Sequence, residues 1–382
     1  FQFYRYNSYE GLFDFGLAKH DITAVTEQQT RTRNILVENL LTFDRTFGDH
    51  KVSALVGYTY QDSRYRYMQG SGQGMPTGIT EIDAASQGLA VSGNSSRSVL
   101  TSILGRAFYS YKNRYLLTAT IRRDGSSKFG SNYRYGNFPS VSVGWNIAEE
   151  DFVKNSVSWL DQLKLRGGYG VLGNQEIDNY QYVSVVTTGI NYPDGKSGLI
   201  QGAFPKTFAN PDIKWEKSYQ QNYGVDMTLF NSLSLSVDYW RTQQRGVLCQ
   251  SDLTPALSGF TGDKLPYTNV GKVQNQGVDI EVGYSKKWNS GFEIGVTGDF
   301  AWNKNEIIDA NDLNYSSIGY YYPFRKTGYS IGQKFGYLID YSNGNGFFNS
   351  RQEIAARKLV YQGVTPRVGD FIYRDLNSDG LI

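Results

Sequence analysis

Residues 219–239, YQQNYGVDMTLFNSLSLSVDY, alternate between apolar and polar side chains on both sides of a short turn. Asn231 and Ser232 form the turn, and each arm keeps a period of two. This period is typical of a strand with one apolar and one polar face, and the stretch therefore predicts a β-hairpin. The predicted apolar face carries Tyr219, Gln221, Tyr223, Val225, Met227 and Leu229, followed by Leu233, Leu235, Val237 and Tyr239.

The same pattern recurs along most of the chain, in pairs of runs joined by short turns. Runs of about ten to sixteen residues exceed the usual strand of a soluble β-sandwich, which has about 5–6 residues. Outer-membrane barrels combine such strands with short periplasmic turns and long extracellular loops. The sequence therefore predicts an all-β protein, a transmembrane antiparallel β-barrel. The long connections are expected near 68–96, 126–137, 174–214, 249–272 and from 309 onward.

Composition excludes several classes of protein. The 382 residues have a mean hydropathy of −0.46, and no window of about 18 apolar residues predicts a membrane-spanning helix. Lysine and arginine number 38 against 36 acidic residues, a balance that argues against nucleic-acid binding. One cysteine, Cys249, and two histidines, His20 and His50, leave little for a metalloenzyme or a catalytic triad. We therefore expect no metal-dependent or triad-based enzyme activity and no required cofactor.

The predicted polar face carries acidic residues that a dry core would not tolerate without partners. A wet or plugged barrel lumen accommodates them. The apolar face then contacts lipid, as for Val141, Val143 and Trp145 in the run 138–145. About ten strands are recognised by alternation, too few for a barrel with such loops, and we expect the rest outside this chain. The inward acids are Asp226, Asp238, Asp279, Glu281, Glu293 and Asp299.

Several motifs occur in the order that a known family shows. They include LGRAFYSYKNRYLLTATIRRDGSSKFG at 104–130, RYGNFPSVSVGWNIAEEDF at 134–152 and LKLRGGYGVLGNQEI at 163–177. On these motifs the chain resembles the SusC/RagA-type TonB-dependent transporters over most of residues 36–308 and again at the C-terminus. Further matching motifs are NPDIKWEK at 210–217, NVGKVQNQGVDIE at 269–281, NKN at 303–305 and GDFIYRDLNSDGLI at 369–382.

The resemblance implies a 22-stranded barrel in the outer membrane of a Gram-negative, Bacteroidota-type bacterium. It also implies an N-terminal plug, a TonB box that couples to TonB, and a SusD-like surface lipoprotein as partner. Such pairs import oligosaccharides or peptides. We expect residues 1–382 to be a barrel segment that lacks the plug, the TonB box and the closing strands, and 309–382 to be an extracellular loop insertion.

Candidate substrate-binding residues lie in the connection after residue 173 and on one strand. Asn174, Gln175, Tyr180 and Tyr182 offer amide and aromatic groups at the predicted extracellular end. Trp240 falls on the polar parity, where it would stack on a sugar ring or contact the plug. Alternatively, the aromatic residues of the loops have a structural role and pack one loop against another.

The acidic motif DLNSDG at 375–380 has the opening spacing of a calcium loop. Asp375, Asn377 and Asp379 occupy positions one, three and five, and Gly380 follows at the turn. A Ca²⁺ ion there would brace the loop, whereas without an ion the segment closes as an Asx turn. Glu149, Glu150 and Asp151 are interpreted as a solvated helix start, because their acids suit the first turn of a helix.

Two other functions fit parts of the pattern. A soluble all-β glycan-binding or glycan-cleaving domain would also be rich in Tyr, Trp and Gly, and it should stay monodisperse without detergent. A passive porin or adhesin shares the alternation but needs no plug or TonB box.

Overall fold

The computed structural model describes residues 1–184, 186–193, 195, 198–205, 209–250, 267–310, 326–334, 336–361 and 363–382. The chain divides into two compact units, Phe1–Asn314 with Lys326–Gly328 and Tyr315–Arg325 with Tyr329–Ile382. We call the second the C-terminal unit. Among the described residues, no helix has both the length and the apolar character required to cross a bilayer.

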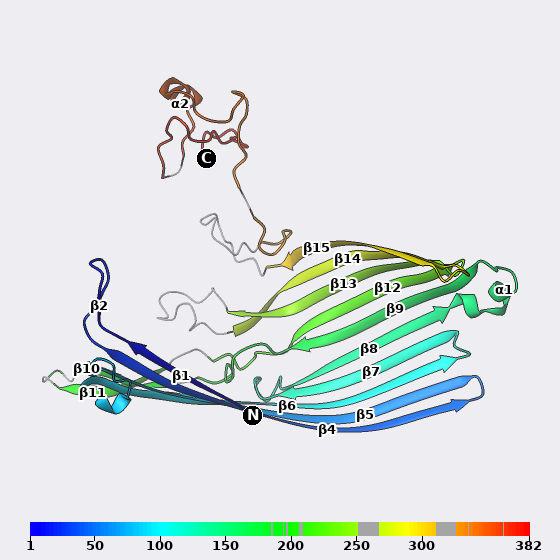
Figure 1. Ribbon diagram of the computed structural model, residues 1–382, viewed down its shortest axis with the longest axis horizontal. Helices are drawn as coiled ribbons and strands as arrows, with labels where there is room; N and C mark the ends of the chain where they lie inside the picture. Colours follow the sequence, from blue (N-terminus) through cyan, green and yellow to red (C-terminus); the bar gives the residue numbers. More distant parts are fainter. Residues whose placement is uncertain are drawn as a thin grey trace. The chain divides into compact units, whose positions relative to one another are not determined.

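The first unit is built on one antiparallel sheet of eleven strands, drawn in Figure 1. Neighbours in the sheet are neighbours in the sequence apart from two short hairpins, β2 (Phe13–Asp14) with β3 (Lys19–His20) and β10 (Val186–Pro193) with β11 (Leu199–Pro205). The all-β prediction is confirmed. The strands in order are β1 (Gln2–Glu10), β4 (Ala24–Phe47), β5 (His50–Gln73), β6 (Gln87–Tyr111), β7 (Tyr115–Ser126), β8 (Tyr135–Asn146), β9 (Leu160–Asn174), β12 (Glu216–Leu229), β13 (Leu233–Gln250), β14 (Tyr267–Lys287) and β15 (Glu293–Asp309).

The register confirms the predicted faces, because residues paired across strands share a face. Val225 pairs with Leu165 and Val237, and Val237 pairs in turn with Ile280. Val225 and Ile294 remain 37% and 41% exposed, and Val237 and Ile280 are only half-buried.

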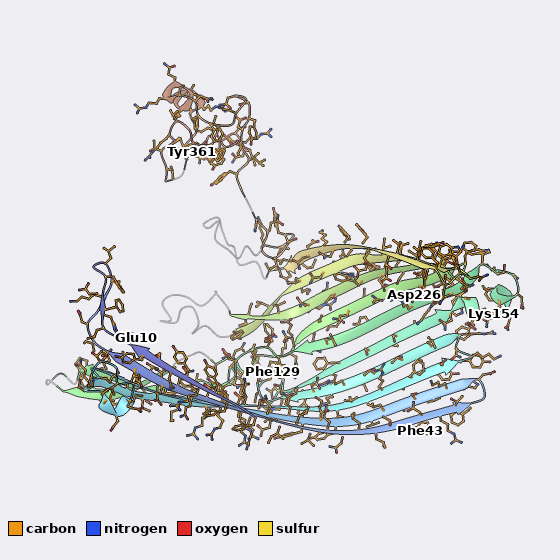
Figure 2. The ribbon with its side chains drawn as sticks, viewed as in Figure 1. Glu10, Phe43, Phe129, Lys154, Asp226 and Tyr361 are labelled. Carbon is orange, nitrogen blue, oxygen red and sulfur yellow. The ribbon has the colours of Figure 1, made fainter. Side chains whose placement is uncertain are left out.

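No second layer of the described residues covers the apolar face of this sheet. Leu41 is 75% exposed, Val296 65% and Val56 59%, and Phe43 projects from the sheet without cover (Figure 2). A soluble sandwich would bury these side chains beneath a second sheet. The exposure of these side chains argues against the soluble glycan-binding or glycan-cleaving alternative.

Short turns close one end of the sheet, and aromatic rings collect there. Ring centroids lie 4.8 Å apart for His50 and Tyr111, 6.4 Å for Tyr111 and Tyr115, and 6.3 Å for Tyr115 and Trp145. Further along, Trp159 stacks on Phe230. Aromatic rings with polar tips are favoured where hydrocarbon meets water, so this row is typical of a membrane-interface girdle.

The predicted helical turn after β8 is present as the 3₁₀ turn η2 (Ile147–Glu149) and the helix α1 (Asp151–Lys154). Arg114 lies 3.1 Å from Glu150 and 2.6 Å from Asp151, measured from guanidinium nitrogen to carboxylate oxygen. Glu150 also accepts a hydrogen bond of 2.9 Å from Trp145 Nε1. The helix start is present, but the expected solvation is wrong for Glu150, which is only 7% exposed because it is held between Arg114 and Trp145.

At the opposite end, three strands are longer than predicted. β4, β5 and β6 have 24, 24 and 25 residues, against about 9–11 that a membrane requires. The connection expected at 68–96 shrinks to 74–86, and Gly70 and Gly72 lie within β5 rather than in a loop. Polar residues and glycines predominate on both faces of this extension, and therefore the alternation that reveals a strand disappears although cross-strand pairing continues. In Figure 1 the three strands run on beyond the ends of β7, β8 and β9.

The apolar belt of β5 has the height of a bilayer. Its outward positions run from Val52 through Val56 to Tyr60. With a rise of about 3.3 Å per residue and a tilt of about 35–45°, nine residues cover about 21–24 Å, close to the apolar band of about 25 Å found in outer-membrane barrels.

The C-terminal unit is small and irregular. It contains the helix α2 (Arg351–Arg357) and three isolated bridges, Ile339 with Tyr373, Phe347 with Phe371, and Val360 with Leu381. Phe348 and Ile372 are almost completely buried and form its core. The extracellular position of residues 309–382 stays a prediction, and residues 311–325 lie outside the described part of the chain.

Replacing Val56 with Arg places a charge at the centre of the predicted lipid belt. We expect the change to destabilise the folded protein by about 2–4 kcal/mol and to reduce its amount in the outer membrane. Unfolding in urea after purification in detergent measures the first, and quantitative blotting of outer-membrane fractions measures the second. The control is Thr59→Arg on the polar face, where Glu38 lies directly opposite. Equal losses in both variants would contradict the assignment of the faces.

Candidate functional site

The polar face of β9, β12 and β13 is organised by one arginine. Arg166 Nε and Nη2 each donate a hydrogen bond of 2.8 Å to Asp226. Its Nη1 and Nη2 donate to Asp238 at 2.6 Å, and Ser236 Oγ donates to Asp226 at 2.9 Å. Two paired carboxylates on one guanidinium form a strong, geometrically specific arrangement. Asp226 is labelled on the sheet in Figure 2.

Gly224 makes room for this network. A Cβ atom at position 224 would lie 2.6 Å from Arg166 Cζ and 2.7 Å from Asp238 Oδ1. These distances are shorter than real Cβ contacts, and therefore a side chain at 224 would displace the guanidinium. The sequence assigned Asp226 and Asp238 to the lumen but gave Arg166 no role, since its pairing requires three strands in register.

Trp240 lies on the polar face, as predicted. It pairs with Gly277 of β14, and a Cβ atom at 277 would lie 2.7 Å from the indole ring. The ring therefore rests against the backbone of the neighbouring strand and is only half-buried. Its position allows stacking on a sugar, a side chain or another part of the protein inside the barrel.

The remaining acids of this face line β14 and β15. Glu281 pairs directly with Asp299, and Asp279 pairs with Asp238 on the β13 side. Glu281, Asp299 and Asp279 are exposed and form no ion pair among the described residues. Like charges directly opposite each other are unfavourable unless water or a basic group screens them. This part of the sheet therefore suits a hydrated lumen or a basic partner.

The other four candidate residues lie in the connection that follows β9. Asn174 closes an Asx turn, since its Oδ1 accepts a hydrogen bond of 2.9 Å from the N–H of Glu176, and Gln175 is half-buried. The Tyr180 hydroxyl accepts a hydrogen bond of 3.2 Å from the backbone N–H of Arg97, and Tyr182 packs against a loop core. The structure does not bring these residues together with Trp240 in any described contact, and their role in binding cargo stays a prediction.

The loop core holds three connections together. Phe129 and Ile213 are fully buried, and the Trp215 ring lies 5.0 Å from Phe129 and 5.3 Å in edge geometry from Phe138. Trp215 Nε1 donates to the Arg134 carbonyl at 3.1 Å. Figure 2 labels Phe129 near the end of the strands where these connections lie. Ile213 and Trp215 fall within the motif at 210–217, but no period marks them as a core, because the residues meet only after folding.

The acidic motif at 375–380 is a network of turns. Asp375 accepts hydrogen bonds of 2.7 Å from the N–H groups of Ser378 and Gly380, and Asp379 accepts one of 2.8 Å from Leu381. Asn377 Nδ2 donates to Asp379 at 2.8 Å. Among the described residues no cluster of three or more His, Cys, Asp or Glu side chains has a metal-binding arrangement. Calcium binding at Asp375, Asn377 and Asp379 stays a prediction.

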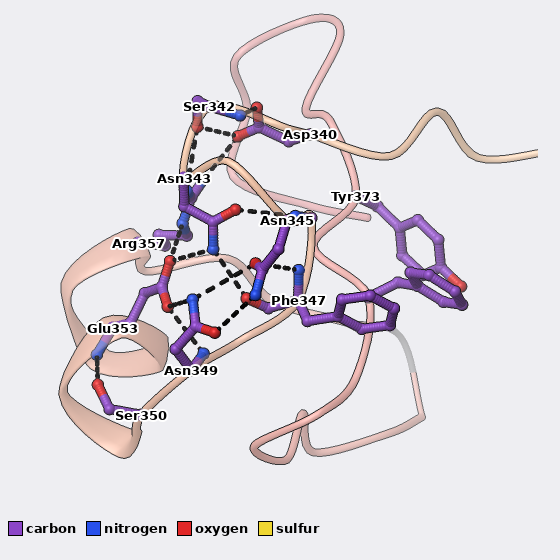
Figure 3. Close-up of polar contacts among 12 residues, drawn as sticks. Asp340, Ser342, Asn343, Asn345, Phe347, Asn349, Ser350, Glu353, Arg357 and Tyr373 are labelled. Atoms are coloured by element: carbon purple, nitrogen blue, oxygen red, sulfur yellow. Dashed lines mark hydrogen bonds and ion pairs between the residues drawn. The ribbon is translucent and has the colours of Figure 1, made fainter.

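A second polar network, which the sequence did not reveal, braces the C-terminal unit (Figure 3). Ser350 caps α2 by accepting a hydrogen bond of 3.1 Å from the N–H of Glu353. The Glu353 carboxylate accepts hydrogen bonds of 2.9 Å from the N–H of Asn349 and 2.8 Å from Asn343 Nδ2. Arg357 Nη1 reaches Asp340 at 2.5 Å. The Ser-x-x-Glu spacing of a capping box was the available signal.

These hydrogen bonds favour the ionised carboxylates. The backbone N–H of Asn349, and then the side chain of Asn343, lower the pKa of Glu353. The backbone N–H of Ser342, followed by Arg357, lowers the pKa of Asp340. A carboxylate that accepts several hydrogen bonds in the folded state loses them on protonation, so the unit is expected to weaken in acid.

Sequence comparison places the chain in a known family. The profile described as TonB dependent receptor-like, beta-barrel, matches residues 1–379. The chain therefore belongs to the TonB-dependent receptor β-barrel family, whose members are outer-membrane β-barrel proteins rather than enzymes. The predicted fold class, the resemblance to SusC/RagA-type proteins and the outer-membrane location are confirmed.

Individual relatives agree with this family. TonB-dependent receptor P39 of Formosa agariphila is 30% identical over 373 residues, which cover 90% of this chain and 35% of that protein. TonB-dependent receptor SusC of Bacteroides thetaiotaomicron is 35% identical over 217 residues, 55% of this chain and 21% of that protein. The structure of the RagAB peptide transporter superposes with a TM-score of 0.73 at 25% identity and covers 86% of this chain and 36% of that one. The chain thus spans about a third of the length of TonB-dependent receptor P39 and of the matched chain in the RagAB structure.

Replacing Gly224 with Ala tests the arginine network. We expect the displaced guanidinium to lower the free energy of unfolding by roughly 1–3 kcal/mol, measured by urea unfolding in detergent. The matched control is Gly168→Ala on the same face, where a Cβ atom would meet Ser142 at an ordinary 3.8 Å. The control should change stability by less than about 0.5 kcal/mol. Tolerance of both substitutions would show that Arg166 is not held as described.

Replacing Glu353 with Gln tests the network of the C-terminal unit. Because folding lowers the pKa of Glu353, the stabilisation it supplies is present at neutral pH. It is lost as the pH falls below the ordinary Glu value of about 4.3 and through the lowered pKa. Amide-exchange protection of residues 343–357, normalised to the unfolded rate at each pH, should therefore fall in acid. The variant should start lower at pH 7 and depend less on pH, whereas an unchanged slope would exclude Glu353 as the cause.

Proposed function

We propose that this chain forms part of the barrel wall of a TonB-dependent importer that takes up oligosaccharides or peptides. The observation that carries the proposal is the two-sided sheet, with an apolar belt on one face and the Arg166 network among exposed acids on the other. Such a wall separates lipid from a hydrated or plugged lumen. Long connections at one end would form the extracellular rim.

The remaining machinery of the importer would come from outside this chain. Among the described strands, β1 and β15 each pair on one side only. Unpaired strand edges are not tolerated in hydrocarbon, so we propose that further strands close the barrel, in the 22-stranded arrangement of outer-membrane transporters. An N-terminal plug with a TonB box would couple import to TonB.

A SusD-like surface lipoprotein is the proposed partner at the extracellular end. The similarity to SusC and to the RagAB peptide transporter supports a two-protein importer. The connection at 174–182 and the insertion at 309–382 lie in the parts of the chain that would form the docking rim. A Ca²⁺ ion at Asp375, Asn377 and Asp379 would stiffen that insertion, and calorimetric titration with and without Asp375→Asn tests this directly.

Cargo contacts are proposed for Trp240 first, and for Asn174, Gln175, Tyr180 and Tyr182 second. The Trp240 ring is half-buried on the lumen face, and its indole forms no hydrogen bond among the described contacts. Tyr180 and Tyr182, in contrast, also stabilise the loops, through a hydrogen bond from Arg97 and through packing on the loop core. Trp240→Ala should therefore reduce uptake several-fold, and Trp302→Ala on the lipid face is the matched control. Both rates are divided by the amount of protein displayed at the cell surface.

The decisive experiment uses the full-length protein. Purification in mild detergent, followed by mass spectrometry, should identify a co-purifying lipoprotein and a bound oligosaccharide or peptide. Uptake of that labelled cargo should stop when TonB is deleted. Uptake that continues without TonB would instead identify the passive porin that the strand pattern also allows, and the absence of a lipoprotein would exclude the SusC-like arrangement.

A further inference from the structure

Five arginines lie side by side on the extended part of β4, β5 and β6. Arg33 pairs with Arg64, Arg64 pairs with Arg97, and Arg31 pairs with Arg66 in the next row. All five side chains are exposed. We call them the arginine rungs. Directly opposite residues have Cβ atoms about 4.5–5.5 Å apart, and like charges at that spacing destabilise a sheet.

One carboxylate compensates only part of this charge. Asp62 is 4% exposed and accepts hydrogen bonds of 2.9 and 3.0 Å from Arg97 and of 3.1 Å from Arg64. Arg31, Arg33 and Arg66 form no ion pair within the described part of the chain. The rungs therefore hold five positive charges against one negative charge, an arrangement that an external anion would relieve.

The rungs lie on the lipid side of the sheet, directly beyond the apolar belt. Successive residues of a strand alternate between faces, so Asp62, Arg64 and Arg66 continue the outward positions that end at Tyr60. Arg97 Nη2 donates a hydrogen bond of 3.5 Å to the Tyr60 hydroxyl, which joins the first rung to the top of the belt. The end concerned is the one with long connections, hence the outer leaflet.

Guanidinium groups bind phosphate through paired hydrogen bonds, and phosphates of membrane lipids lie at the edge of the hydrocarbon. We propose that the arginine rungs bind the phosphate groups of an anionic glycolipid in the outer leaflet. The rungs and Tyr180 line one shallow groove with Met68 and Val91, which places apolar contacts beside the charges. The bound lipid would fix the height of this edge of the barrel in the membrane.

The test measures binding of diphosphorylated lipid A to the full-length protein in mild detergent, by native mass spectrometry. The variant Arg31→Gln/Arg33→Gln/Arg66→Gln leaves the pairing with Asp62 intact. It should weaken binding at least tenfold, and binding to the native protein should fall as salt is raised. The control removes the same charge from the C-terminal unit, with Arg351→Gln/Arg367→Gln/Arg374→Gln, and should bind as the native protein does. Heat-modifiable migration on gels verifies that each variant is folded.

Further arms identify the source of the phosphate. Dephosphorylated lipid A should bind at least tenfold more weakly than the diphosphorylated form. Equal binding of the two, or of the triple variant and the native protein, overturns the proposal. Displacement of the lipid by equimolar inorganic phosphate would indicate a site for free anions and would overturn the proposal. If the triple variant loses a protein partner but still binds the lipid, the arginine rungs are a protein-binding surface, and the proposal is overturned as well. Because lipid binding is measured without transport, the result tests the lipid site independently of the proposed import function.

Discussion

The structure depends on one constraint, that each strand separates two different solvents while its backbone hydrogen bonds are completed by its neighbours. Hydrocarbon offers no partner for an N–H or C=O group, and therefore the strands must pair continuously along the belt. The uninterrupted registers of β4 with β5 and of β12 with β13 meet this demand. Since one face contacts lipid and the other water, the side chains must alternate.

The two faces achieve stability by different means. On the lipid face, exposed residues such as Leu41 and Val296 need no protein cover, because the bilayer takes the place of a core. On the lumen face, charges are stabilised only where a partner is within reach, as at Arg166 with Asp226 and Asp238. Gly224 shows that this pairing also requires empty space at a third position.

Beyond the membrane, apolar and polar side chains no longer alternate, and strands are therefore harder to predict from the sequence. The ends of β5 and β6 within residues 68–96 were expected to lie in a loop, since water on both faces removes the apolar signal that marks a strand. The arginine rungs lie in this part, where cross-strand neighbours come from three separate segments. The loop core was likewise hidden, because it joins Phe129 to Trp215, which lie more than eighty residues apart in the sequence.

The sequence alone determined the all-β class, the short-turn end, the two faces of most strands and the position of Trp240. These properties are local, since period-two alternation is imposed residue by residue by the solvents on each side. Only the tertiary structure decided which charges meet. Arg166 and Asp238 lie on strands that are not adjacent in the sequence, and Arg33, Arg64 and Arg97 share a row only because two registers align them. Distances of a few ångströms between distant segments have no counterpart in a linear pattern.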